Sequence, residues 1–330
     1  MKKMVFLSIF MLLAAIVAFS GCLGGKAEAT NVVIGYQPST HQMAYTSAKA
    51  MGWWTDNLTQ LSSVKNVSDN SFPSGPSEAT ALASNAIQVA YIGAAPLIPS
   101  IAQNNSDLKI IAAVQINGSS LLVPTNADYT GPKYFEGKKI ATFPPGSIQD
   151  TLLKQWLVDN GVDLSKVEIK GMDGGEAQTA LKVGAVDAVF LPHPSPSIIA
   201  AAGDGKVVMT SGEMSADHAC CVLAVSQKFI DEHPDIVREI IKIHVDATEY
   251  TKNNPGEAVK YYANITGISE EIVLQSVDDW DGQWISDPHI IEDYVVAYAQ
   301  SQYEQGLTPR PLTKGELFDT NFYDEYVNNK

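Results

Sequence analysis

Short apolar runs alternate along this chain with longer segments of helical spacing, from residue 31 onward. The runs are rich in β-branched residues, and in the segments after them apolar residues recur every three or four positions. That alternation is typical of strands followed by helices. The predicted strands are residues 32–36, 63–67, 87–92, 108–115, 120–124, 138–143, 167–171, 186–191, 206–209 and 220–226. The pattern favours an α/β protein with mainly parallel sheets and helices on both faces.

The chain beyond residue 231 changes character. It is mostly helical in pattern, and Pro234 and Pro255 stand near the first turns of two helices, where proline is favoured. We expect this tail to pack against a lobe rather than to form a third domain.

The N-terminus has the pattern of a targeting segment. Two lysines precede an apolar stretch at residues 4–19, which is followed by Ser20-Gly21-Cys22. A basic start, an apolar core and small residues before a cysteine are typical of a secretory signal. The segment resembles a bacterial or archaeal lipoprotein signal in which Cys22 carries the lipid. We therefore expect a signal at 1–22, a tether at 23–30 and a body held on the outer face of the cytoplasmic membrane. An uncleaved membrane anchor is the alternative.

The net charge and the cysteine content argue against several kinds of partner and against a disulfide-stabilised fold. The chain has 22 basic and 37 acidic residues, a net charge of −15, which argues against nucleic acid and anionic lipid headgroups as partners. Its three cysteines are Cys22 and the adjacent pair Cys220-Cys221. Neighbouring cysteines fit disulfide geometry poorly, so no disulfide framework is expected.

Four turns between a predicted strand and a predicted helix have a similar composition: each contains proline, and glycine and serine each occur in three of the four. They lie at residues 36–40, 72–77, 93–96 and 143–147. Plain helix capping explains each one singly. Together, at the carboxyl ends of strands, they favour one shared ligand cleft, because free N–H groups at helix starts bind anions. None has the spacing of a nucleotide-binding loop.

Four longer stretches carry a family resemblance. They are FPSGPSEATALASNAIQVAYIGAAPLIPSIAQNNSDLKIIAAV, FEGKKIATFPPGSIQDTLLKQWLVDNGVDLSKVEI, EAQTALKVGAVDAVFLPHP and CCVLAVSQKFIDEHPDIVREII. In order and spacing they resemble the substrate-binding proteins of nitrate, sulfonate and taurine ABC transporters, the SsuA/NMT1-like family.

The resemblance implies a type II periplasmic-binding fold with two α/β lobes. Lobe one would comprise 31–118 and the tail 218–330, and lobe two 119–217, joined by a hinge of crossing strands near 120–123 and 222–225. The lobes would close round the ligand, and the loaded form would dock on a membrane permease. The resemblance also implies that the protein is a monomer, has no cofactor and is not an enzyme.

Turns and resemblance together predict the ligand-binding residues. These are Gln37, Ser39, Gly75, Gly93, Ala94, Ala95, Asn117, Ser119, Gly146, Ser147, Gln149, Asp150 and His193. His193 departs from the family pattern, which often has an aromatic-acidic-proline turn there. A histidine at this point can donate to an anion, accept from an amine, ligate a metal or simply be solvated. Asp150 either recognises an amine or faces solvent.

The segment His218-Ala219-Cys220-Cys221 is unusual. Thiols and histidines can complete a soft metal site. Adjacent residues on a strand point to opposite faces, however, so we expect buried, inert thiols and no metal site, with His218 and Cys220 as the candidates if one exists.

The predicted function is an extracytoplasmic ABC-importer receptor for a small oxyanion of the alkanesulfonate, taurine or nitrate class. The four turns contain no lysine or arginine. This favours, as an alternative, a neutral or zwitterionic solute such as a pyrimidine precursor of thiamine. A metal-dependent enzyme that makes that precursor shares only the fold and a cysteine cluster with this chain. A sensor subunit on the same fold remains the third alternative.

Overall fold

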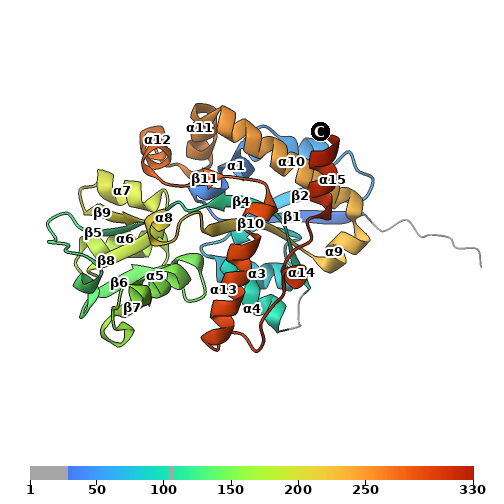
Figure 1. Cartoon of the computed structure of the whole chain (residues 1–330). Helices are drawn as coiled ribbons and strands as arrows, with labels where there is room; N and C mark the ends of the chain where they lie inside the picture. The colour runs from blue at the N-terminus through green and yellow to red at the C-terminus, as the bar shows by residue number, and fades with distance from the viewer. Residues whose placement is uncertain (1–28, 104–106) are drawn as a thin grey trace, which may run out of the picture.

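The computed structural model describes residues 29–103 and 107–330, and Figure 1 shows them as two α/β lobes lying side by side. The predicted signal, with Cys22, and residues 23–28 of the predicted tether lie outside the described residues. Among the residues that are described, no helix is both long and apolar enough to cross a membrane.

The first lobe is built on six strands in the order β11-β4-β10-β3-β1-β2. Strand β1 runs parallel to β2 and β3, whereas β10 runs antiparallel to β3 and β4. The central strands are buried along nearly their whole length, as expected where helices cover both faces. The strands are β1 (Thr30–Tyr36), β2 (Val64–Ser71), β3 (Val89–Gly93), β4 (Leu108–Ile116), β10 (Ala219–Ser226) and β11 (Gln283–Trp284).

The second lobe is built on five strands in the order β7-β6-β8-β5-β9. Strand β6 is parallel to β7 and β8, and β5 is antiparallel to β8 and β9. Separate apolar clusters cover the two faces of this sheet. The strands are β5 (Ser119–Pro124), β6 (Lys139–Thr142), β7 (Glu168–Gly171), β8 (Ala188–Pro192) and β9 (Gly205–Thr210).

Both sheets are mixed rather than mainly parallel, which corrects the expectation from the sequence. Strand β5 follows β4, and β10 follows β9, so each is the first strand after the chain passes from one lobe to the other. Each inserts antiparallel to its neighbours. The ten predicted strands all occur, and β2 extends four residues past its predicted end.

Helices fill the spaces between strands and make up most of the tail. The first lobe holds η1 (Thr40–Gln42), α1 (Met43–Ala50), α2 (Trp53–Leu58), α3 (Gly75–Ala83) and α4 (Ala94–Ala102); the second holds α5 (Ile148–Asp159), α6 (Gly174–Lys182), α7 (Ser195–Ala201) and α8 (Ser211–Met214). The tail holds α9 (Gln227–Glu232), α10 (Pro234–Asn253), α11 (Pro255–Thr266), α12 (Glu270–Asp279), α13 (Glu292–Glu304), α14 (Lys314–Leu317) and α15 (Asn321–Asn329).

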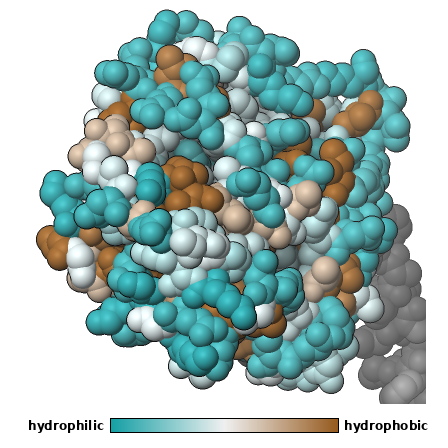
Figure 2. Space-filling model, turned by 60° about the vertical axis from the view of Figure 1, so that its left-hand side comes forward, coloured by the Kyte–Doolittle hydropathy of each residue, from teal (hydrophilic) through white to brown (hydrophobic). Residues whose placement is uncertain are grey.

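The tail contacts both lobes. Helix α10 packs on α1 in the first lobe, whereas α12 packs on α7 in the second (Figure 1). On the face shown in Figure 2, hydrophilic side chains dominate and apolar ones are scattered among them. The apolar residues are instead concentrated in the cores, of which the first lobe's is the largest.

The two passages between the lobes meet at one carboxylate. Asn117 and Gly118 form the first passage, both with positive φ (57° and 86°), a conformation that glycine adopts without strain. Asp281, in the loop after α12, accepts a hydrogen bond from Gly118 N at 2.8 Å and another from Gly212 N at 2.5 Å. Gly212 lies in α8, where the second passage back to the first lobe begins, so the tail bonds to the chain at both crossings.

Candidate functional site

A cleft of about 290 Å³ lies between the lobes. The first lobe lines it with residues 37–39, His41 and Cys220-Cys221, among others, and the second with residues 147–149, 173–175 and 192–195. The lobes touch beside it, because Thr40 N donates to His193 O at 3.1 Å. The volume suits a small solute that both lobes enclose.

Helix starts from both lobes converge on this cleft. Helices α3, α6 and α7 begin with residues that line it, namely Gly75, Gly174 and Ser195. The N-caps of α4 and α5, Gly93 and Ser147, also line it. All four turns predicted from the sequence contribute lining residues. The positive ends of several helix dipoles therefore face one small volume, an arrangement that suits an anion.

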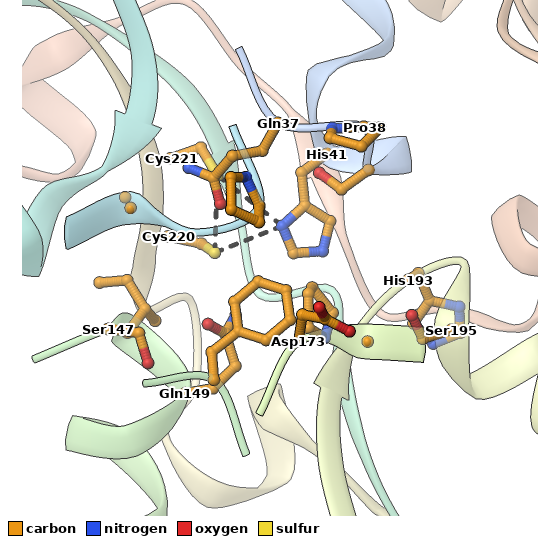
Figure 3. Close-up of a pocket in the computed structure, with 18 of the residues that line it drawn as sticks. Gln37, Pro38, His41, Ser147, Gln149, Asp173, His193, Ser195, Cys220 and Cys221 are labelled. Atoms are coloured by element: carbon orange, nitrogen blue, oxygen red, sulfur yellow. Dashed lines mark hydrogen bonds between the residues drawn. The ribbon is translucent and has the colours of Figure 1, made fainter. Parts of the chain in front are cut away.

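Seven of the predicted ligand-binding residues line the cleft. They are Gln37, Ser39, Gly75, Gly93, Ser147, Gln149 and His193. Figure 3 shows Ser147 and Gln149 on the second-lobe side, facing Gln37 and His41 on the first. For these residues, ligand contact remains a prediction that their position favours.

The other six predicted residues are not among those that line the cleft. Ala94 and Ala95 are fully buried at the start of α4. Asn117 forms the passage between the lobes, and Ser119 Oγ accepts a hydrogen bond from Gln149 Nε2 at 3.1 Å. Asp150 holds its own turn together: it accepts from Gly146 N at 3.1 Å and pairs with Lys154 Nζ at 2.7 Å. Direct ligand contact by these six, Gly146 included, stays a prediction.

His193 lies at the end of β8 and is only 2 % exposed, which rules out a solvated turn histidine. Its Nε2 lies 3.1 Å from Ser120 Oγ, and its Nδ1 lies 3.2 Å from Ser276 Oγ and 3.3 Å from Ser197 Oγ. Burial lowers its pKa to about 3, and the nearby His41 acts in the same direction. The ring is therefore neutral near pH 7, and both of its nitrogens are already engaged by serine hydroxyls.

The sequence profile of the NMT1-like family matches residues 25–266. The chain belongs to the NMT1-like family. A Bacillus subtilis (strain 168) protein named for binding aliphatic sulfonates is 29% identical over 277 residues, covering 83% of this chain and 81% of that protein. The taurine-binding periplasmic protein of Escherichia coli (strain K12) is 27% identical over 249 residues, covering 74% and 73%.

The fold of this NMT1-like protein is similar to that of a solved structure. The alkanesulfonate-binding protein SsuA from Xanthomonas axonopodis pv. citri bound to MOPS superposes with a TM-score of 0.77 at 19% identity, covering 88% of this chain and 99% of that one. The resemblance and the periplasmic-binding fold predicted from the sequence are thus confirmed.

Four lining residues of the NMT1-like protein carry chemistry that the sequence analysis does not assign: His41, Asp173, Ser195 and Cys221. Asp173 and Ser195 follow β7 and β8 at the starts of α6 and α7. The turns that precede α6 and α7 also join a strand to a helix. Treating them like the four turns considered in the sequence would have identified Asp173 and Ser195 as candidates. His41 and Cys221 are brought together only by the fold.

His41 meets both cysteines on the first-lobe wall of the cleft, and Figure 3 shows the three side chains pointing toward one another. Its Nδ1 lies 3.4 Å from Cys220 Sγ and 3.8 Å from Cys221 Sγ, and the two sulfurs are 3.8 Å apart. The hydrogen bond with Cys220 lowers the pKa of Cys221 to about 5, and burial opposes this. The same pairing raises the pKa of Cys220.

His218, the other metal candidate, does not join this group. It is buried outside the cleft lining, with Nδ1 3.2 Å from Ala219 O and 3.3 Å from Tyr298 Oη. Burial lowers its pKa to about 4, so this histidine is neutral near pH 7. Its contacts are those of a packed core residue.

Proposed function

We propose that this NMT1-like protein is the extracytoplasmic receptor of an ABC importer, which captures a small oxyanion by closure of its two lobes and delivers it to a membrane permease. The observation that carries the proposal is the convergence of helix starts from both lobes on one small cleft. The names of its relatives, which bind sulfonates and taurine, support the ligand class and a role in binding rather than catalysis. The lipid at Cys22 would hold the receptor beside the permease.

The lining of the cleft supports a particular kind of oxyanion. Of the described residues that line it, none is lysine or arginine, and Asp173 is the one carboxylate. Helix starts can hold the anionic end of a ligand, and Asp173 can hold a cationic end. A zwitterionic sulfonate such as taurine matches both features better than nitrate does.

Calorimetry and thermal shift on the chain from Lys26 onward, which keeps every described residue, test this proposal. The panel is taurine, ethanesulfonate and nitrate, with ethylamine as the matched compound that lacks the sulfonate. At a hundredfold excess over Kd, a true ligand stabilises the folded state by about 2.7 kcal/mol. We expect one-to-one binding of taurine and none of ethylamine. Failure of all three anions to bind would refute the oxyanion proposal.

Replacing Asp173 separates the two ends of the ligand. Asp173 Oδ1 caps α6 by accepting from Glu176 N at 2.8 Å, and asparagine caps helices about as well. We expect Asp173→Asn to weaken taurine binding by about tenfold, as loss of one charged hydrogen bond does, with ethanesulfonate unchanged. An equal effect on both ligands would show that Asp173 does not contact the amine.

A neutral solute is the second candidate, and the absence of cationic side chains from the described lining favours it. Ser39, Ser147 and Gln149 in the lining offer hydrogen bonds without charge. Adding a pyrimidine precursor of thiamine to the same panel decides between the two. Binding of the pyrimidine without binding of any anion would establish this candidate.

A further inference from the structure

The histidine and the two cysteines form a compact donor set. His41 lies in η1 after the first strand, and Cys220 and Cys221 lie in β10, about 180 residues later. The three side chains are 1 %, 1 % and 6 % exposed, and all three line the cleft. Among the described residues, this is the group of histidine, cysteine and acidic side chains whose donor atoms all lie within 4.8 Å of one another.

An irregularity in β10 explains how adjacent cysteines reach the same histidine. On a regular strand, Cys220 and Cys221 would point to opposite faces of the sheet. The pairing of β10 with β4 shifts register between Ala219 and Cys221 and again between Cys221 and Val222. Such a bulge re-aims a side chain, and here it brings both sulfurs to one side. This corrects the expectation that the two adjacent side chains point to opposite faces.

The backbone fixes which nitrogen of His41 faces the sulfurs. Its Nε2 lies 2.6 Å from Gly118 O, and a carbonyl can only accept, so Nε2 carries the proton. The lone pair of Nδ1 is then directed at Cys220 and Cys221. A metal-binding histidine almost always has its second nitrogen held by a carbonyl or carboxylate in this way.

The separations match tetrahedral coordination. With Zn–S bonds of about 2.3 Å and Zn–N bonds of about 2.05 Å, tetrahedral angles place two sulfur ligands about 3.8 Å apart and a sulfur and a nitrogen about 3.6 Å apart. The sulfurs here are 3.8 Å apart, and the two S–N distances, 3.4 and 3.8 Å, bracket the second value. The three donor atoms thus already have separations close to those of tetrahedral ligands.

We propose that His41, Cys220 and Cys221 bind a thiophilic d¹⁰ cation of the Zn²⁺ class, with its fourth coordination position open to the cleft. Binding releases the remaining thiol proton, that of Cys220, to solvent, and the two thiolates balance the charge of the ion. A second part of this proposal rests on the proposed function: the anionic end of the solute takes the fourth coordination position of the ion. The ion thereby supplies the cation that the described lining side chains lack.

Competition with a chromophoric chelator measures Zn²⁺ binding to the purified full-length protein. We expect one ion per chain, and about 100-fold or greater loss of affinity in Cys220→Ser and in Cys221→Ser, since loss of even a supporting group costs 10–100-fold. His289→Gln is the matched control. His289 is an exposed histidine beside Glu292 and Asp324, and its loss should leave Zn²⁺ binding unchanged.

Two further readouts separate metal loss from misfolding. In EDTA the serine variants should have the same melting temperature as the wild type. Zn²⁺ should raise the melting temperature of the wild type but not that of the variants. Zn²⁺ should also protect Cys220 and Cys221 of the wild type from alkylation, as mapped by mass spectrometry. Cobalt should give a sulfur-to-metal charge-transfer band in the wild type. Absence of both protection and the band would overturn the proposal.

Taurine binding measured with and without Zn²⁺ distinguishes the metal-site proposal from the receptor proposal. Taurine binding is measured on zinc-loaded and EDTA-treated protein, and we expect tighter binding to the loaded form. Taurine binding without any Zn²⁺ binding would overturn the metal site and leave the receptor proposal intact. Zn²⁺ binding without binding of any anion would support the metal site and overturn the oxyanion receptor. Equal taurine affinity in both forms would overturn the coordination of the solute.

Discussion

The buried residue His244 should make this protein sensitive to mild acid. It lies fully buried in α10, with Nε2 donating to Ala113 O at 2.7 Å and Nδ1 3.0 Å from Tyr91 Oη. Burial lowers its pKa from 6.5 to about 4. Because the unfolded chain takes up the proton first, the stabilising effect of His244 is complete above pH 6.5 and is lost as the pH falls toward 4.

The expected size follows from linkage. With pKa values of 6.5 unfolded and about 4 folded, His244 alone lowers the free energy of unfolding by about 1.4 kcal/mol at pH 5.5 and about 2.5 kcal/mol at pH 4.5, relative to pH 8. His244→Gln keeps a donor for Ala113 O and removes the titration. The variant should be about 1 kcal/mol less stable at pH 8, from the lost contact with Tyr91, but less sensitive to acid.

Urea unfolding at pH 8, 5.5 and 4.5 measures the difference between the two proteins. His289→Gln is the control of opposite sign. Asp324 and Glu292 raise the pKa of His289, so its contribution is present at low pH and is lost as the pH rises. Parallel stability-against-pH curves for the wild type and His244→Gln would refute the reasoning, because they would mean that the buried ring does not resist protonation.

The remaining predictions concern the cleft and the crossings. A Cβ at Gly93 would lie 3.2 Å from Ile148 Cγ1 on the opposite lobe and 3.3 Å from Pro96 Cδ, so Gly93→Val should weaken solute binding by about tenfold and lower the free energy of unfolding by about 1–3 kcal/mol, whereas Gly256→Ala, with open space around it, should leave solute binding unchanged. Ser147→Ala removes the acceptor that caps α5 and should cost about 1 kcal/mol in urea unfolding as well as weaken binding; unchanged calorimetry would place the ligand elsewhere. Asp281→Ala leaves two backbone N–H groups without their acceptor and should lower the free energy of unfolding by about 2 kcal/mol or more; wild-type stability would show that water replaces the carboxylate.

The sequence predicts those features that depend on nearest neighbours along the chain. Apolar periodicity locates the strands: apart from the longer β2, each strand between residues 30 and 226 begins and ends within two residues of its predicted bounds. The composition of the turns locates the cleft wall at Gly93 and Ser147, because a helix start needs those residue types wherever it faces a ligand. The direction of β5 and β10 could not be predicted, since it depends on which lobe the chain has left.

Contacts between side chains could likewise be predicted from the sequence only where the partners are close along the chain. The pairing of Asp150 with Lys154 is local, at i and i+4 on one helix, and was available from the sequence as evidence against a ligand role. The meeting of His41 with both cysteines was not. It depends on the register shifts between β10 and β4, which involve strands about a hundred residues apart and leave no mark in the local sequence.

The carboxylate of Asp281 has a mechanical consequence. It holds one N–H from each passage between the lobes, Gly118 in one and Gly212 in the other. If these bonds hold while the angle between the lobes changes, atoms next to Asp281 move little and the ends of the two lobes furthest from it move most. The closure in the proposed function would then be a hinge motion about Asp281, and not a sliding of one lobe across the other.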